Sequence, residues 1–174
     1  MAKLRPGRCI RDPKRAYTRV SKYKKLSYVK SSLGTKIVQF VSGNPNGKFN
    51  YSISVLSSRD IVIRDNAIEA ARVAANKILS SKLSDENFLL VVKQYPHHFI
   101  REHKLAAVAQ ADRFWMGMSL SFGKVAGRAV RVNTGAELFR ITVDESNAKV
   151  AEEAAKAIEK KLGFRMLIIP NYSK

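Results

Sequence analysis

The chain has 174 residues, enough for one ordinary domain with a hydrophobic core. Its 32 Lys and Arg residues against 14 Asp and Glu residues give a net charge of +18, which predicts a polyanionic partner such as nucleic acid. No apolar run approaches the roughly 20 residues that span a bilayer, and a single cysteine, Cys9, excludes a disulfide framework, so we expect a reduced cytoplasmic protein.

The positive charge is concentrated in two segments of the chain. Residues 1–36 hold 12 basic residues and one acid, and residues 93–131 hold seven basic residues and two acids. The rest of the chain is close to neutral, so these two segments carry 16 of the 18 net charges. Charge that served only solubility would be spread more evenly, and the concentration therefore predicts two binding surfaces.

Residues 1–35 have the composition of a basic, extended N-terminal segment. Prolines and a glycine occur early, and the segment has too little apolar material to build a core. Its interleaved tyrosines, Tyr17, Tyr23 and Tyr28, either stack on unpaired RNA bases or pack onto the domain. The basic residues predicted to bind RNA here are Arg5, Arg8, Arg11, Lys14, Arg15, Arg19, Lys22, Lys24 and Lys25, and Lys36 follows at the start of the domain.

Residues 36–174 are predicted to form one α+β domain. Runs of β-branched and aromatic residues between turn residues predict its strands. The predicted strands cover residues 36–41, 51–55, 61–63, 88–94, 99–101, 125–132, 138–143 and 166–169. We expect residues 61–63 to extend the sheet formed by the preceding strand, and Pro170 to end the last strand.

Two helices are predicted from the spacing of apolar residues. Asp65 or Asn66 is expected to cap the first helix, which continues to about Ser81. The second opens at Ser146 and stops at Gly163. The apolar stripe of the first helix consists of Ile68, Ala71, Ala75, Ile78 and Leu79. Both helices lie in near-neutral parts of the chain, which predicts a two-layer sandwich of two helices on a mainly antiparallel sheet.

An internal loop at about residues 102–117 interrupts the domain. Its Ala-rich sequence fits either a helical turn or a long excursion between strands. Phe114 and Trp115 near its end are either base-stacking platforms or core residues. The basic residues of the loop and its approach are Arg101, His103, Lys104 and Arg113. Lys124, Arg128 and Arg131 on the following strand are predicted to bind RNA.

Motifs for catalysis are weak. The glycine-containing run at residues 123–128 lacks the residue order of a phosphate-binding loop. His97 and His98 are neighbours on a predicted strand and would point to opposite faces, so they do not readily share a metal ion. We therefore predict no catalytic residue, metal or cofactor. An RNA-modifying enzyme, one alternative, would need a cofactor motif that the chain lacks.

Several longer motifs occur in the order of a known family. They are RPGRC at residues 5–9, AYTR at 16–19, TKIVQF at 35–40, EAARVAANK at 69–77, YPHHFIRE at 95–102, ADR at 111–113, GM at 117–118 and SFGKVAGRAVRV at 121–132. Together they resemble the large-subunit ribosomal proteins numbered ten in the archaeal and eukaryotic series and sixteen in bacteria. The resemblance is close over about residues 4–145 and looser in the C-terminal helix and strand.

The resemblance implies a hammerhead-type fold bound to large-subunit rRNA, near the aminoacyl-tRNA path and the peptidyl transferase centre. It implies that the loop points towards the tRNA acceptor region, and that other ribosomal proteins and assembly factors are partners in late subunit assembly. No homo-oligomer is expected. The sequence departs from the family at Gln110, where glycine is usual, at Ser119, where arginine is common, and in the apolar run at residues 114–116.

A free-standing RNA-binding or chromatin-type protein is the main alternative, because the same basic segments would suit it. Such a protein would act outside the ribosome. Sedimentation of cell extract at high salt distinguishes the two, since only a ribosomal protein would continue to migrate with large subunits.

Overall fold

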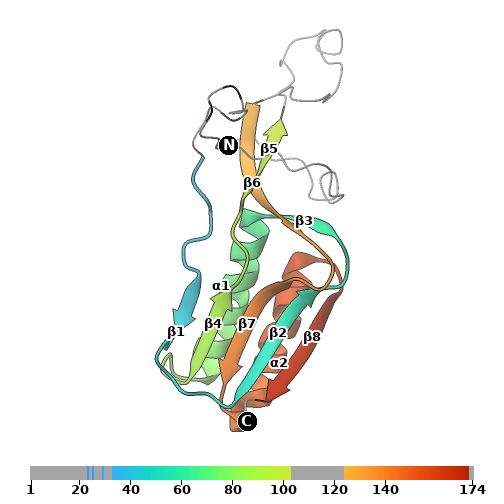
Figure 1. Cartoon of the computed structure of the whole chain (residues 1–174). Coiled ribbons are helices and arrows are strands. Elements are labelled where there is room, and N and C mark those ends of the chain that lie inside the picture. The colour runs from blue at the N-terminus through green and yellow to red at the C-terminus, as the bar shows by residue number, and fades with distance from the viewer. Residues whose placement is uncertain (1–22, 24, 26–28, 30–32, 103–123, 173–174) are drawn as a thin grey trace, which may run out of the picture.

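The computed structural model of the chain describes residues 23, 25, 29, 33–102 and 124–172. These ranges contain eight strands and two α-helices. In chain order, each helix is preceded and followed by strands (Figure 1). The elements are β1 (Val41–Gly43), β2 (Tyr51–Ser57), β3 (Ile61–Arg64), α1 (Asp65–Lys82), β4 (Phe88–Val92), β5 (His98–Glu102), β6 (Lys124–Val132), β7 (Glu137–Val143), α2 (Ala148–Leu162) and β8 (Met166–Tyr172).

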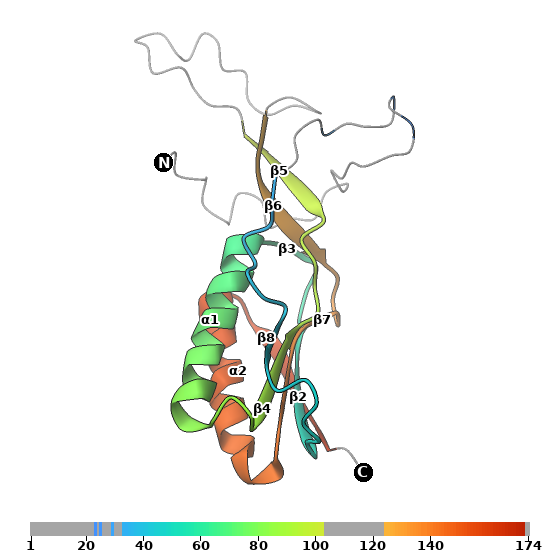
Figure 2. The same cartoon turned by 90° about the vertical axis from the view of Figure 1, so that its left-hand side faces the viewer.

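The strands form two separate sheets, and every described pair of neighbours is antiparallel. The larger sheet has the order β1-β4-β7-β2-β8 and the smaller has the order β3-β6-β5. Both helices lie on one face of the larger sheet, as Figure 2 shows from the side. The predicted two-layer α+β arrangement is therefore confirmed. Neither helix in the described ranges combines the length and the apolar character needed to cross a membrane.

The expectation that residues 61–63 extend the first sheet is wrong. β2 pairs with β7 on one side and with β8 on the other, so both of its edges are occupied. After the turn that follows Ser57, the chain pairs instead with β6. The small sheet still contributes to the common core, because Ile61, Ile63, Val130 and Val132 pack into the same buried cluster as the helices.

Alanines line much of the contact between the two helices and the core. Ala71 and Ala75 of α1 and Ala151, Ala154 and Ala155 of α2 are fully buried. Small side chains let the helices approach each other closely, and the large side chains of the sheet fill the opposite side of the core. Those large buried residues are Tyr51, Ile53, Val55, Phe88, Leu90, Phe139 and Ile141.

The ends of the helices differ in part from expectation. Arg64 occupies the cap position of α1 and Asp65 is its first residue, although the Asp65 carboxylate does accept a hydrogen bond from the Asn66 amide at 2.8 Å. Ile78 is only partly buried, whereas Leu79 is fully buried. A short 3₁₀ turn precedes α2, which begins at Ala148 and not at Ser146. The predicted stop at Gly163 is confirmed, because this glycine caps α2 at a φ of +70°.

Two strand predictions are corrected. Residues 36–40 are not a strand, and β1 begins only at Val41. The reason is that side-chain carboxylates of α1 accept the hydrogen bonds of the backbone amides of Lys36 and Val38. The last strand does not end before Pro170 but continues to Tyr172. β8 is the edge strand of its sheet, where the missing N–H of a proline is tolerated.

Candidate RNA-binding surface

Basic side chains gather on the paired strands β5 and β6, which we call the β5–β6 ribbon. The ribbon extends beyond the helices, at the end of the molecule away from the last residues of β8 (Figures 1 and 2). It carries Arg101, Lys124, Arg128 and Arg131 against a single acid, Glu102. Glu102 pairs in register with Lys124, so the segment between them leaves and rejoins the ribbon at adjacent strand ends.

Arg128 is held by aromatic side chains at the base of the ribbon. Its guanidinium lies over the ring of Phe99, 5.0 Å from the ring centroid, and donates a hydrogen bond of 3.1 Å to the Tyr95 hydroxyl. The Tyr95 ring in turn stacks on Phe40, with centroids 5.8 Å apart. Because planar partners restrict the rotamers of arginine, its remaining donors are held in a set direction for an acceptor such as phosphate.

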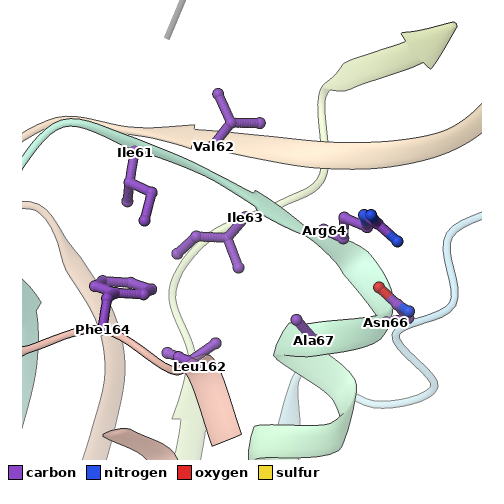
Figure 3. A pocket seen from close by; sticks show the side chains of 8 residues that line it. All are labelled: Ile61, Val62, Ile63, Arg64, Asn66, Ala67, Leu162 and Phe164. Atoms are coloured by element: carbon purple, nitrogen blue, oxygen red, sulfur yellow. The ribbon is translucent and has the colours of Figure 1, made fainter. Parts of the chain in front are cut away.

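The opposite face of the small sheet also gathers cationic groups. In register, Ala129 lies between Arg64 of β3 and His98 of β5, and Arg131 follows two residues along β6. Figure 3 shows that Val62 points to the other side of β3 from Ile61 and Ile63. Since side chains alternate along a strand, Val62 and Arg64 share this second face.

His98 on this face is neutral at physiological pH. Burial and then the positive charge of Arg131, followed by His97 and Arg101, lower the pKa of His98 to about 4. Protonation would place a further charge in a partly buried cationic cluster, so the imidazole stays uncharged. His98 therefore adds hydrogen-bonding capacity to this face without adding to its positive potential.

Residues 33–40 run along α1 as an extended segment that we call the strap (Figure 2). The amide of Lys36 donates to a carboxylate oxygen of Asp65 at 3.1 Å, and the amide of Val38 donates to Glu69 at 3.3 Å. Ile37 between them is buried at 5% exposure. Two carboxylates and one apolar anchor thus fix the path of the chain next to the small sheet, and leave the Lys36 side chain exposed.

Glu69 of α1 is the main residue that connects the helix to the strap. Arg72 donates two hydrogen bonds to its carboxylate, at 2.9 and 2.6 Å, and also reaches the Ser42 hydroxyl at 3.2 Å. The hydrogen bond from Arg72 is the main reason that the pKa of Glu69 is lowered. This pair therefore connects α1 both to the strap and to β1.

Lowering the pH should reduce the stability that Glu69 contributes to the fold. A carboxylate with a lowered pKa stabilises the fold above its ordinary pKa of about 4.5 and loses that contribution as the pH falls through its lower folded value. We expect Glu69→Gln to reduce stability at pH 7 by about 1–3 kcal/mol, because Arg72 is 7% exposed and loses its charged partner. The deficit should shrink towards pH 3. Urea unfolding at both pH values measures this.

A matched control for this change is Glu153→Gln. Glu153 forms an ion pair with Lys82 in which both side chains are about half exposed, so its loss should change stability little. Equal effects of the two substitutions at pH 7 would contradict the role assigned to Glu69.

A pocket of about 170 Å³ lies beneath β3, between the start of α1 and the end of α2 (Figure 3). Its described lining is apolar except for Arg64 and Asn66, which stand at one end. Within the described residues, no group of three His, Cys, Asp or Glu side chains is arranged to hold a metal ion. The pocket therefore offers packing space and none of the groups that general acid–base chemistry requires.

Only some of the predicted binding residues lie in the part of the chain that the structure describes. Arg101, Arg128 and Arg131 are half-buried on the ribbon, while Lys25, Lys36 and Lys124 are exposed. The remainder lie outside the described residues, as do Cys9, Phe114 and Trp115. These are Arg5, Arg8, Arg11, Lys14, Arg15, Arg19, Lys22, Lys24, His103, Lys104 and Arg113.

Sequence reasoning missed four residues that belong to this surface. Tyr95 and Phe99 orient Arg128, and Arg64 and His98 flank Ala129. The run from Tyr95 to Glu102 stood out as a motif, which was a usable signal for its aromatic members. Arg64 gave no such signal, because its neighbours on the face come from strands far away in the sequence.

Comparison with known proteins supplies the remaining evidence. The family model "Ribosomal protein L16p/L10e" matches residues 14–169. The chain is 45% identical to a protein of Sulfolobus acidocaldarius over 168 residues, 95% of this chain and 92% of that one. It is 42% identical to a Thermofilum pendens protein over 95% of this chain and 96% of that one, and 40% identical to a Methanococcus maripaludis protein over 98% and 96%.

All three relatives bear the name "Large ribosomal subunit protein uL16". A match over most of both chains at this identity extends through the ribbon, the strap and both helices. The predicted family is therefore confirmed, and with it a structural and not an enzymatic role in the cytoplasmic large ribosomal subunit. The chain belongs to the L16p/L10e family of ribosomal proteins.

Proposed function

We propose that this protein binds large-subunit rRNA through its N-terminal basic segment and the β5–β6 ribbon, near the aminoacyl-tRNA path and the peptidyl transferase centre. There it supports tRNA positioning and late subunit assembly, with assembly factors among its partners. The observation that carries the proposal is that the excess positive charge and the packed helices and larger sheet occupy different parts of the protein. Four basic residues gather on a projecting ribbon, whereas the helices and the larger sheet are close to neutral.

The chemistry of the ribbon suits an RNA backbone. Arginine donates forked hydrogen bonds to phosphate, and contacts of this kind fix the position of a protein on nucleic acid. Arg128 is pre-oriented by Phe99 and Tyr95, which lowers the entropy that binding must overcome. The proposed rRNA contacts are Arg5, Arg8, Arg11, Lys14, Arg15, Arg19, Lys22, Lys24, Lys25, Lys36, Lys124, Arg128 and Arg131.

The loop between the ribbon strands is proposed to face tRNA. Both of its ends are held by paired strands, so a contact at its tip can be transmitted to a firm base. The proposed tRNA-proximal residues are Arg101, His103, Lys104 and Arg113. Of these, Arg101 lies within β5 and has contacts of its own, which makes it a less selective site for mutation.

Replacing Lys104 and Arg113 with alanine tests this proposal. The double variant should melt at nearly the temperature of the wild type, because solvated charges contribute little to stability. In reconstituted large subunits it should slow maturation or weaken tRNA binding, since each lost phosphate contact weakens a polyanion complex. Incorporation is measured first and tRNA binding second, with Lys156→Ala and Lys160→Ala of α2 as the matched control.

The outcomes of this experiment separate the parts of the proposal. Chemical footprinting of rRNA with the wild-type protein should show protection around the peptidyl transferase centre, and protection confined to other regions would contradict the proposed location. Normal incorporation and tRNA binding of the double variant would mean that the loop is passive. A large loss of thermal stability would mean that the loop residues belong to the core.

A further inference from the structure

Within the part of the chain that the structure describes, one face of the larger sheet has no covering layer. Both helices pack on the same side of this sheet, and the other side, which we call the outer sheet face, stands open in the side view (Figure 2). The register identifies its members, because residues paired across neighbouring strands point to the same side. Leu56 and Ser54 of β2 pair with Leu167 and Ile169 of β8, and Val41 of β1 pairs with Val91 of β4.

Several large apolar side chains on this face are exposed. Val41, Leu167 and Ile169 are 47%, 44% and 43% exposed, and Leu56 is half-buried beside the last two. Three branched apolar residues on adjacent strands, Leu56, Leu167 and Ile169, therefore form one continuous patch at the β2–β8 end. Contiguous apolar patches on a soluble protein commonly mark an interaction site.

The outer sheet face is also poor in charge. Its centre holds Arg140 and Glu137, which satisfy each other through two hydrogen bonds of 2.8 Å. Glu137 additionally accepts a hydrogen bond of 2.8 Å from the Ser54 hydroxyl. Beyond this pair, Lys93 is the nearby charge that acts on Glu137. Among the described residues, the outer sheet face therefore carries almost none of the excess positive charge.

Charge decides what kind of partner fits this face. Nucleic acid binds where several cations neutralise phosphates, and the outer sheet face offers too few. A second copy of this chain is disfavoured, because it would bring another +18 charges close to the first. A partner protein that is neutral or acidic and presents apolar side chains meets neither obstacle.

The edge of the sheet indicates how such a partner would bind. β8 is an edge strand, but Pro170 within it has no N–H to offer to an added strand. Proline on an edge strand is one of the ways in which proteins prevent strand addition. Packing against the face is therefore favoured over extension of the sheet.

We propose that the outer sheet face, at the patch formed by Leu56, Leu167 and Ile169, docks an apolar, neutral or acidic segment of a neighbouring protein in the large ribosomal subunit. The inference rests on family membership and goes beyond the proposed rRNA and tRNA contacts, which lie on other elements. The two can fail independently, because the docking patch can be altered without touching the ribbon or the N-terminal segment.

Two substitutions of opposite charge at one position test the proposal. Ile169→Lys and Ile169→Glu both place a charge in an apolar contact, so each should lower competitive incorporation into subunits reconstituted with rRNA and ribosomal proteins by about tenfold or more. Binding of Ile169→Lys to protein-free rRNA should stay at or above the wild-type level, because lysine is compatible with RNA. Melting temperatures verify that both variants fold.

The matched control is Val73→Lys, which makes the same kind of change at a 50% exposed position on α1. It should be incorporated almost normally. If RNA covered the face, only Ile169→Glu would be impaired, and that pattern would overturn the proposal. Normal incorporation of both Ile169 variants, or equal impairment of Val73→Lys, would overturn it as well.

A crosslinking experiment identifies the occupant directly and does not depend on destabilising variants. A photoreactive amino acid at position 167 in the full chain, within reconstituted subunits, should crosslink to another ribosomal protein. Crosslinks to rRNA, to a second copy of this chain, or to nothing would each overturn the proposal. The photoreactive amino acid placed at position 73 instead of position 167 serves as the control.

Discussion

A Leu79→Asp variant should lose most of the stability of the folded protein. Leu79 is fully buried on α1, and a carboxylate at this site would have no partner among the alanines and aliphatic residues of the core cluster. The loss of a buried leucine and the burial of a charge together cost about 4–5 kcal/mol or more. Because typical domains are stable by only about 5–15 kcal/mol, the midpoint of urea unfolding should fall sharply.

Two further substitutions on the same helix show how the loss of stability depends on burial. Val73→Asp likewise replaces an aliphatic side chain with a carboxylate, at a 50% exposed site, and should reduce stability by about 1 kcal/mol or less. Ile78→Asp should lie between them, because Ile78 is partly buried against the core. Lys156→Ala on the exposed side of α2 should have almost no effect. Similar unfolding midpoints for the three aspartate variants would show that the helix faces are assigned incorrectly.

Deletion of residues 1–30 should have the largest effect on RNA binding. It removes 11 basic residues and one acid from the proposed rRNA-binding surface. If about half of these basic groups meet phosphates, the slope of log affinity against log salt concentration should fall by about four to five. Binding of the full chain and the deletion variant to a large-subunit rRNA fragment, measured over a series of KCl concentrations, provides both slopes.

The control for this deletion removes charge from the scaffold. Lys149, Lys156, Lys160 and Lys161 are exposed on α2, and their joint replacement by glutamine removes four positive charges. That variant should change the salt slope by less than about one, since α2 lies outside the proposed interface. An unchanged slope in the deletion variant would mean that residues 1–30 are not a phosphate-binding arm.

The candidate surface could be predicted only in part. Clustering of charge at residues 93–131 indicated Arg101, Lys124, Arg128 and Arg131, because charge density is a local property of the sequence. The orientation of Arg128 depends on Tyr95 and Phe99 from one other part of the chain, and on Phe40 from a second part, which stacks on Tyr95. Periodicity reports that a residue is buried or exposed, but it does not report which residues meet.

The strap shows a second limit of local reasoning. Its β-branched and aromatic residues are typical of a strand, and the sequence alone therefore predicts one over residues 36–41. In the folded protein, the carboxylates of Asp65 and Glu69 accept the hydrogen bonds of its amides. Two side chains, 29 and 31 residues away in the sequence, thus take the place of a strand partner, and local propensity cannot express such a contact.

The sequence by itself determined the kind of each main element, the separation of charge from scaffold and the family. Helical spacing, β-branched runs and charge counts are carried by neighbouring residues and need no partner. The tertiary structure alone decided that β2 is enclosed by β7 and β8, so that β3 starts a second sheet. Among the described residues, it also left one face of the larger sheet open. Strand partners lie as far apart as Tyr51 and Tyr172, and their pairing is selected by the packing of the whole core.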